Sequence, residues 1–292
     1  MGIDNTAARM ILLLKNVAGQ NLENTLVFGH QRNYIGYQLR KRISSELGIS
    51  RNVLSSKYAD EFLSAVGAKG FQVLDMSSYE GAQVIQDLNI PIPDNLHNKF
   101  SVVMDIGTSE HVYDVAQSLA NIRNLCILGG QIMVLSPANR FLGHGFYQFS
   151  PELFFRAFSQ EHGFDIQALY LIKDSLFKQR WYQLADPKNL GRRGNISTGK
   201  RCFIGVVATK VSEKRNIHSP LQSDYVGAWS KSQVSRLGAK YLALPSLVQR
   251  LLGITVIAVL RRFRNRISPQ KFYWKDGAYI PSITNRKLSL KI

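Results

Sequence analysis

The sequence predicts an α/β protein built on a doubly wound sheet. Short apolar runs rich in β-branched residues alternate with helical patterns through residues 1–210, as in a parallel sheet with crossover helices. Acidic residues follow several of these runs, and two late runs have no strong helix between them. We therefore expect a Rossmann-like, seven-stranded sheet, mostly parallel with one antiparallel edge strand, followed by a basic helical C-terminal extension.

Four apolar runs supply the first half of the expected sheet. They are Thr25–Phe28, Gly70–Asp75, Gln83–Ile85 and Phe100–Asp105. Gly29 ends the first run, and helical patterns over residues 34–47 and 58–66 precede the second. This order indicates strand and helix units that repeat along the chain.

The second half continues the alternation. The expected elements are a helix over Val112–Leu128, a strand over Gln131–Leu135, a helix from Pro151 to about His162, and strands over Ile166–Ile172 and Arg201–Thr209. We expect Gly129 and Gly130 to end the first helix. Ser150 is typical of an N-cap before a proline at the first helical position.

The net charge of +17, from 37 Lys and Arg against 20 Asp and Glu, is unevenly distributed. Residues 211–292 hold 15 Lys and Arg and only 3 Asp and Glu, so +12 lies there. The polar run Val211–Pro220 reads as a linker. We therefore expect two domains, residues 1–210 and a basic extension over residues 211–292, and an anionic partner.

The extension contains the apolar run Leu251–Leu260, which is too short for the ~20 residues that a membrane span needs. Arginines follow at 261–266, and the pattern over residues 242–275 suits an anchor on an anionic membrane surface. The alternative is a helix that packs on the domain or on a second copy in a homo-oligomer. Nucleic acid is the less favoured partner, because no known binding module is present. We expect a cytoplasmic protein, peripheral at the inner membrane face if the anchor forms.

Several classes of chemistry lack their motifs. Cys126 and Cys202 are too few for a disulfide framework or a zinc site, which fits a reducing compartment. The stretch Gly29–Gly36 does not have the G-x-G-x-x-G spacing, and no G-x-x-x-x-G-K-[ST] occurs. The 6 histidines are scattered in sequence, so no metal site is expected.

Ligands of an open α/β sheet bind beyond the carboxyl ends of its strands. Asp75, Asp87 and Asp105 follow three of the expected strands. A carboxylate after the second strand can accept both ribose hydroxyls of a nucleoside, and Asp87 could meet an adenine edge. Each could instead be an ordinary turn former or helix cap.

Two further segments carry candidate catalytic residues. After Asp105, Gly107 permits close backbone approach, and Glu110 and His111 could line the mouth of a site. The competing interpretation is a helix start with a capping hydroxyl and a favourable Glu110. The long loop over residues 136–151 holds His144 between two glycines and near several aromatics, which is typical of a segment that closes over substrate.

Residues 25–210 resemble the class I S-adenosylmethionine-dependent methyltransferase superfamily. The resemblance rests on the strand Phe100–Asp105, on Glu110-His-Val112 and on Leu125–Leu135, which looks like an L-x-P-G-G-x-L pattern. Residues 74–81, 87–91 and 143–152 look like an uncharacterised bacterial methyltransferase-like group that we associate with surface-glycan genes. The resemblance implies S-adenosylmethionine as cofactor.

The resemblance also implies roles for individual residues. Asp75 would bind the ribose, Asp87 and Leu88 the adenine, and Gly29 would lie beside the methionine part. Met76, Asp105 and Gly107 complete the expected cofactor-binding set, and the expected catalytic set is Glu110, His111 and His144.

Two departures from the superfamily stand out. Val27-Phe-Gly-His-Gln-Arg32 has no carboxylate and one glycine where the superfamily has an acid before a G-x-G run, and the first two strands are unusually far apart. The expected activity is methyl transfer to an oxygen nucleophile of a glycan or lipid-linked sugar. The alternatives are a non-catalytic binding protein with this fold and an RNA methyltransferase.

Overall fold

The structure, a computed structural model, describes residues 2–18, 22–50, 53–174, 179–190, 196, 198–214, 219–227 and 229. Two compact units are present, and every strand described belongs to the first, which includes residues 2–184 and 200–220. The membrane-anchor prediction for residues 242–275 lies outside the described residues, and so does most of the basic extension. The predicted domain boundary at residue 210 stays a prediction.

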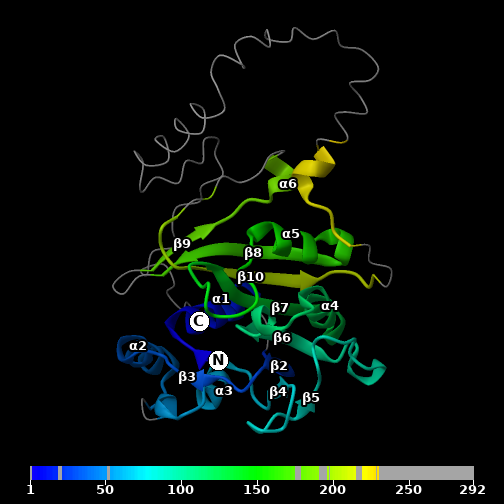
Figure 1. Ribbon diagram of the computed structural model, residues 1–292. Helices are drawn as coiled ribbons and strands as arrows, with labels where there is room; N and C mark the ends of the chain where they lie inside the picture. The colour runs from blue at the N-terminus through cyan, green and yellow to red at the C-terminus, as the bar shows by residue number, and fades with distance from the viewer. Residues whose placement is uncertain are drawn as a thin grey trace, which may run out of the picture. The chain divides into compact units, whose positions relative to one another are not determined.

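The elements follow one another along the chain as Figure 1 shows. The strands are β1 (Gly2–Ile3), β2 (Thr25–Phe28), β3 (Arg32–Asn33), β4 (Gln72–Asp75), β5 (Val84–Ile85), β6 (Phe100–Ile106), β7 (Cys126–Asn139), β8 (Phe164–Lys173), β9 (Arg180–Gln183) and β10 (Cys202–Lys210). The α-helices are α1 (Asn5–Ala18), α2 (Tyr37–Leu47), α3 (Asp60–Val66), α4 (Val115–Leu125), α5 (Pro151–Ala157) and α6 (Pro187–Leu190). α6 belongs to the second unit.

An eight-stranded sheet with the order β5-β4-β2-β6-β7-β10-β8-β9 forms the centre of the first unit. The five strands from β5 to β7 are parallel, whereas β10 is antiparallel to both β7 and β8, and β9 is antiparallel to β8. The predicted α/β class with a mostly parallel sheet is confirmed. The prediction of seven strands with one antiparallel edge strand is wrong, because β10 is inserted inside the sheet and β9 adds an eighth strand.

The region after α4 also differs from the prediction. α4 ends at Leu125, and β7 starts at once with Cys126, so Gly129 and Gly130 lie in the strand rather than at a helix end. Gly129 has a φ of 78°, and a Cβ on Gly130 would lie 2.9 Å from the carbonyl oxygen of Ser101 on β6. The two glycines therefore bend the strand and let its backbone approach β6 closely.

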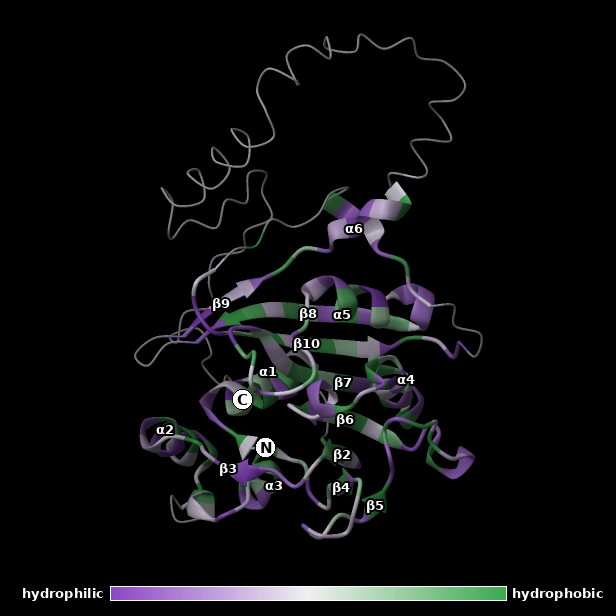
Figure 2. Ribbon diagram, in the orientation of Figure 1, coloured by the Kyte–Doolittle hydropathy of each residue, from purple (hydrophilic) through white to green (hydrophobic). Residues whose placement is uncertain are grey.

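The core has a layer of side chains on each face of the sheet. Side chains of α1, α2 and α3 pack in one cluster with alternate residues of β6, among them Val102 and Met104. The intervening residues Val103 and Asp105 point to the opposite face, because successive strand residues alternate. Both are buried, and α4 packs on β6. β8 and β10 are hydrophobic over much of their length (Figure 2).

α1 has no counterpart among the elements expected from the sequence, and it contains the apolar stretch Met10–Leu14. Asp4 caps it, since its carboxylate accepts the N–H groups of Thr6 and Ala7 at 2.8 and 2.9 Å. All five residues of the stretch are buried, so its apolar character serves the core. Within the described residues, no helix is long and apolar enough to cross a membrane.

A buried lysine fixes the end of β10. Lys210 is 5% exposed, and its ammonium donates to Asn98 Oδ1 at 2.7 Å and to the carbonyl oxygens of Arg123 and Cys126 at 3.2 and 2.9 Å. An ion pair with Glu213 at 3.2 Å supplies the counter-charge. Three hydrogen bonds and a carboxylate offset the cost of burying the charge.

Neither cysteine should react with a thiol reagent in the folded protein. Cys126 and Cys202 are fully buried, and burial raises the pKa of Cys126 to about 12, which suppresses the reactive thiolate. Mass spectrometry after iodoacetamide treatment should find both residues unmodified in buffer and both alkylated in guanidinium chloride. Rapid alkylation of Cys126 in buffer would contradict the packing at the start of β7.

Candidate functional site

The carboxyl ends of the parallel strands meet at one edge of the sheet, where the winding direction reverses. From β2 the chain continues to β4 and β5 on one side and then returns through β6 and β7 on the other. The reversal lies between β2 and β6, where ligands bind in open α/β sheets. The hydroxyl of Thr108 donates across this point to the carbonyl oxygen of Phe28 at 3.3 Å.

On one side of the reversal, three strand ends lie next to one another. Gly29 donates its N–H to the carbonyl oxygen of Leu74 at 2.8 Å, and Gln86 donates its N–H to the carbonyl oxygen of Asp75 at 2.9 Å. These two bonds place Gly29, Asp75 and Asp87 at successive strand ends. The φ of 70° at Gly29 is a left-handed conformation that favours glycine.

The two acidic side chains here are accessible and only partly engaged. Asp75 is half-buried, and its Oδ1 accepts the N–H of Met76, whose side chain is 64% exposed. Asp87 accepts the N–H and the side-chain amide of Asn89 at 2.8 and 2.9 Å, and these hydrogen bonds lower the pKa of Asp87. Leu88 is 6% exposed and supplies an apolar floor beside it.

Asp105 lies near the carboxyl end of β6, on the other side of the reversal. Its side chain is fully buried, and its carboxylate accepts the N–H of Thr108 at 2.8 Å and that of Ser109 at 3.3 Å. Burial raises the pKa of Asp105, and the hydrogen bonds from Ser109 and Thr108 oppose that rise. Gly107, with a φ of 80°, completes the tight turn. Asp105 and Gly107 therefore set the conformation of the turn that follows β6.

Glu110 lies in the 3₁₀ turn Ser109–His111 that Asp105 supports. Its side chain is 1% exposed, and within the described residues its Oε2 has no hydrogen-bond partner. Burial raises the pKa of Glu110 to about 8, and the nearby Asp105 carboxylate adds to the rise. A carboxyl group whose pKa is strongly perturbed by burial and by a neighbouring charge is a candidate for a functional site.

His111 and His144 lie beside Glu110. His144 Nε2 is 3.6 Å from Glu110 Oε1, and the two imidazole rings are 5.0 Å apart between centroids. Burial, together with the neighbouring His144, lowers the pKa of His111. The structure thus brings the three predicted catalytic residues together, although the histidines are 33 positions apart.

The loop that carries His144 is attached to the turn that carries Glu110. The carbonyl oxygen of Glu110 accepts the N–H groups of Phe146 and Tyr147 at 2.9 and 3.3 Å. A Cβ on Gly145 would lie 2.8 Å from the same carbonyl oxygen and 3.1 Å from His111 Nδ1. Only a glycine at 145 lets the loop approach this closely, so its backbone fixes where His144 lies.

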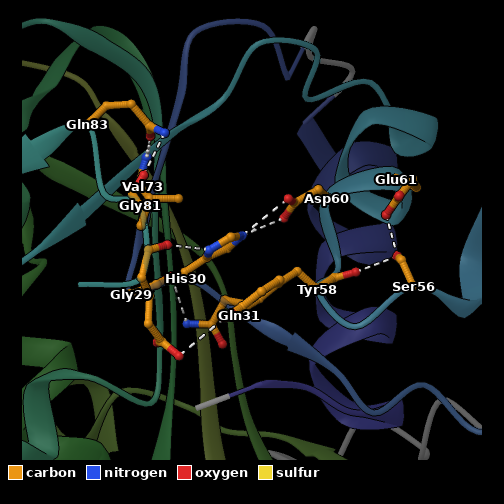
Figure 3. Close-up of polar contacts among 11 residues, drawn as sticks. Gly29, His30, Gln31, Ser56, Tyr58, Asp60, Glu61, Val73, Gly81 and Gln83 are labelled. Atoms are coloured by element: carbon orange, nitrogen blue, oxygen red, sulfur yellow. Dashed lines mark hydrogen bonds and ion pairs between the residues drawn. The ribbon is translucent and has the colours of Figure 1, made fainter. Parts of the chain in front are cut away.

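A second polar cluster, centred on His30 and absent from the predicted site residues, follows β2 (Figure 3). His30 Nδ1 is 2.7 Å from the carbonyl oxygen of Glu80, and Nε2 is 3.0 Å from Asp60 Oδ1. The ring stacks on Tyr58 with centroids 3.7 Å apart. The Glu80 carbonyl oxygen and the Asp60 carboxylate are both hydrogen-bond acceptors. The cluster links β2, α3 and the segment after β4.

Comparisons with known proteins find methyltransferases among solved structures. No family model matches the chain, and no curated protein does either. A candidate methyltransferase from Bacillus halodurans has a TM-score of 0.42 and 10% identity, covering 69% of this chain and 99% of its own. Geranyl diphosphate C-methyltransferase from Streptomyces coelicolor has a TM-score of 0.40 and 11% identity, and the match covers 70% of this chain and 78% of that protein.

Replacing Asp105 with alanine should destabilise the protein and displace the turn that holds Glu110. The two amide groups that its carboxylate accepts would lose their partner, which costs about 1–3 kcal/mol for each buried group. Urea unfolding of the Asp105→Ala variant measures the loss, with Asp165→Ala at the start of β8 as the control. Equal stability of the two variants would contradict the supporting role of Asp105.

Proposed function

We propose that this chain is an S-adenosylmethionine-dependent methyltransferase that acts on an oxygen nucleophile. The observation that carries the proposal is the arrangement at the strand ends: Gly29, Asp75 and Asp87 line one side of the reversal, and a buried carboxyl with two histidines lies on the other. A nucleoside-binding edge beside a proton-accepting cluster is what group transfer from a nucleoside cofactor requires.

The residues present fit the nucleoside part of this cofactor. The half-buried carboxylate of Asp75 keeps acceptor capacity for the two ribose hydroxyls, because a carboxylate has about four lone-pair sites and Met76 takes one. The Asp87 carboxylate would accept a hydrogen bond from the adenine edge, and the buried Leu88 would pack against the adenine ring. Gly29 would let the backbone approach the methionine part.

The histidine pair would remove the proton of the acceptor. The cofactor supplies a methyl group on a sulfonium; as the acceptor oxygen bonds to that carbon, the carbon–sulfur bond breaks and sulfur keeps the electron pair. The hydroxyl proton goes to an imidazole nitrogen of His111 or His144. Glu110, 3.6 Å from His144, positions that ring.

We propose a glycan or lipid-linked sugar of cell-surface polysaccharide biosynthesis as the acceptor. Tyr113 and Phe146 support this class, since their rings are 75% and 66% exposed and lie two residues from His111 and His144. The two rings contact each other edge to face, with centroids 5.9 Å apart. Such exposed rings can pack against the apolar face of a sugar ring.

One observation favours a non-catalytic binding protein as the second candidate. The cluster around His30 follows β2 where the superfamily has its glycine-rich run, and the ring is held on both nitrogens and one face. If this cluster excludes the methionine part of the cofactor, the chain would keep the fold and the turn that carries Glu110 but would catalyse no methyl transfer.

Calorimetric titration of the purified chain with S-adenosylmethionine and S-adenosylhomocysteine tests the proposal. We expect binding of both, and Asp75→Ala should weaken it by about 1.5–3 kcal/mol, roughly 10- to 150-fold, since hydrogen bonds to a charged group are lost. Asp165→Ala is the control and should bind as the wild type does. No binding at millimolar cofactor would favour the non-catalytic candidate.

A further inference from the structure

We infer that Glu110, His111 and His144 form a binding site for a divalent transition-metal ion. Each residue offers one ligand atom, and these atoms lie within 4.8 Å of one another. Two imidazoles and one carboxylate are a ligand set of zinc and non-haem iron centres that keep open positions for water or substrate.

The distances need only a small adjustment. Three ligands around an ion with bonds of ~2.1 Å in tetrahedral geometry are about 3.4 Å apart. His144 Nε2 and Glu110 Oε1 are already 3.6 Å apart. The remaining pairs of ligand atoms lie within 4.8 Å, and both histidines are accessible, so rotation of the two rings can shorten these distances without moving the core.

An independent observation points to a cation at this place. Glu110 Oε2 lies inside the protein without a hydrogen-bond partner among the described residues, while Oε1 of the same carboxylate faces His144. A buried carboxyl group is ordinarily neutralised by a proton, paired with a cation or bound to a metal, because an unpaired buried charge costs free energy. The Nε2 atom of His144 is the one cationic partner within ion-pair distance in the part of the chain that the structure describes, and it is positive only when protonated.

The backbone also supports a preorganised set. Glu110 and His111 are adjacent in a 3₁₀ turn that Asp105 holds, and the loop with His144 is hydrogen-bonded to the Glu110 carbonyl oxygen. All three ligands are thus fixed by two connected segments. The two imidazole ligands favour zinc, cobalt or iron(II) over magnesium, calcium or manganese, which suit oxygen ligands.

The role of the ion rests on the proposed function, whereas ion binding itself does not. An acceptor hydroxyl that takes an open position on the ion would have a lowered pKa and release its proton to water, since nitrogens that bind the ion cannot accept it. With the ion bound, a Lewis acid would activate the acceptor hydroxyl in place of a histidine base. The site would then favour acceptors whose hydroxyl can bind the ion.

Titration of the chelator-treated 292-residue chain with Co²⁺, monitored by calorimetry and by the visible absorption bands of the bound ion, tests the site. We expect one ion per chain. His144→Ala and Glu110→Gln should weaken binding at least as much as loss of an outer-shell partner does, roughly 10- to 100-fold. His97→Ala, which changes an exposed histidine elsewhere, should leave it unchanged.

Two glycine variants keep all three ligands and test their placement. Gly145→Ala brings a methyl group against the Glu110 carbonyl oxygen and should weaken Co²⁺ binding, whereas a Cβ on Gly143 meets nothing within 4 Å, so Gly143→Ala should bind as the wild type does. Circular dichroism verifies that each variant is folded. Absence of stoichiometric binding by the wild type, or wild-type affinity in both His144→Ala and Gly145→Ala, would overturn the inference.

No cofactor or acceptor is present in this titration. A chain that binds Co²⁺ but not S-adenosylmethionine would retain the metal site and lose the proposed function. A chain that binds S-adenosylmethionine but not Co²⁺ would retain the proposed function, with the histidines acting as proton acceptors.

Discussion

The carboxylate of Asp105 is the constraint on which the geometry of the site depends. It lies inside the protein one residue before the end of β6 and accepts the N–H groups of Thr108 and Ser109 in the segment that follows. The chain therefore turns sharply at Gly107, which places Glu110 and His111 at the sheet edge. The same turn presents the carbonyl oxygen of Glu110 to the loop after β7. One buried side chain thereby sets the positions of groups on two strand connections.

The fold was predictable where a strand is apolar and has turn residues at its ends. β2 occupies the expected residues, and β6 extends the expected run by one residue. α1 was missed because Met10–Leu14 is apolar without a helical period. β9 was missed because a strand of four residues, of which Trp181 and Tyr182 are buried, is too short to show an alternating pattern. The place of β10 is set by pairing with two distant strands, which no local pattern records.

The candidate site was predictable in parts but not as an assembly. Asp105, Glu110 and His111 are close in sequence, and glycines on both sides mark His144, so each residue could be found singly. Their meeting depends on a loop that returns across β6, and scattered histidines therefore gave no sign of a common ligand set. The partners of His30 come from two other segments, which is why its cluster had no sequence signal.

The insertion of β10 between β7 and β8 has a consequence for how the chain folds as it leaves the ribosome. β7 and β8 are made first, yet each has an edge that only residues 202–210 cover. Until those residues emerge, two long apolar strands expose unpaired backbone, a state in which nascent chains are prone to aggregate. Arrival of Lys210 completes the sheet and joins its last strand to α4 and β7. Co-translational folding of this unit thus finishes late, with the burial of Lys210.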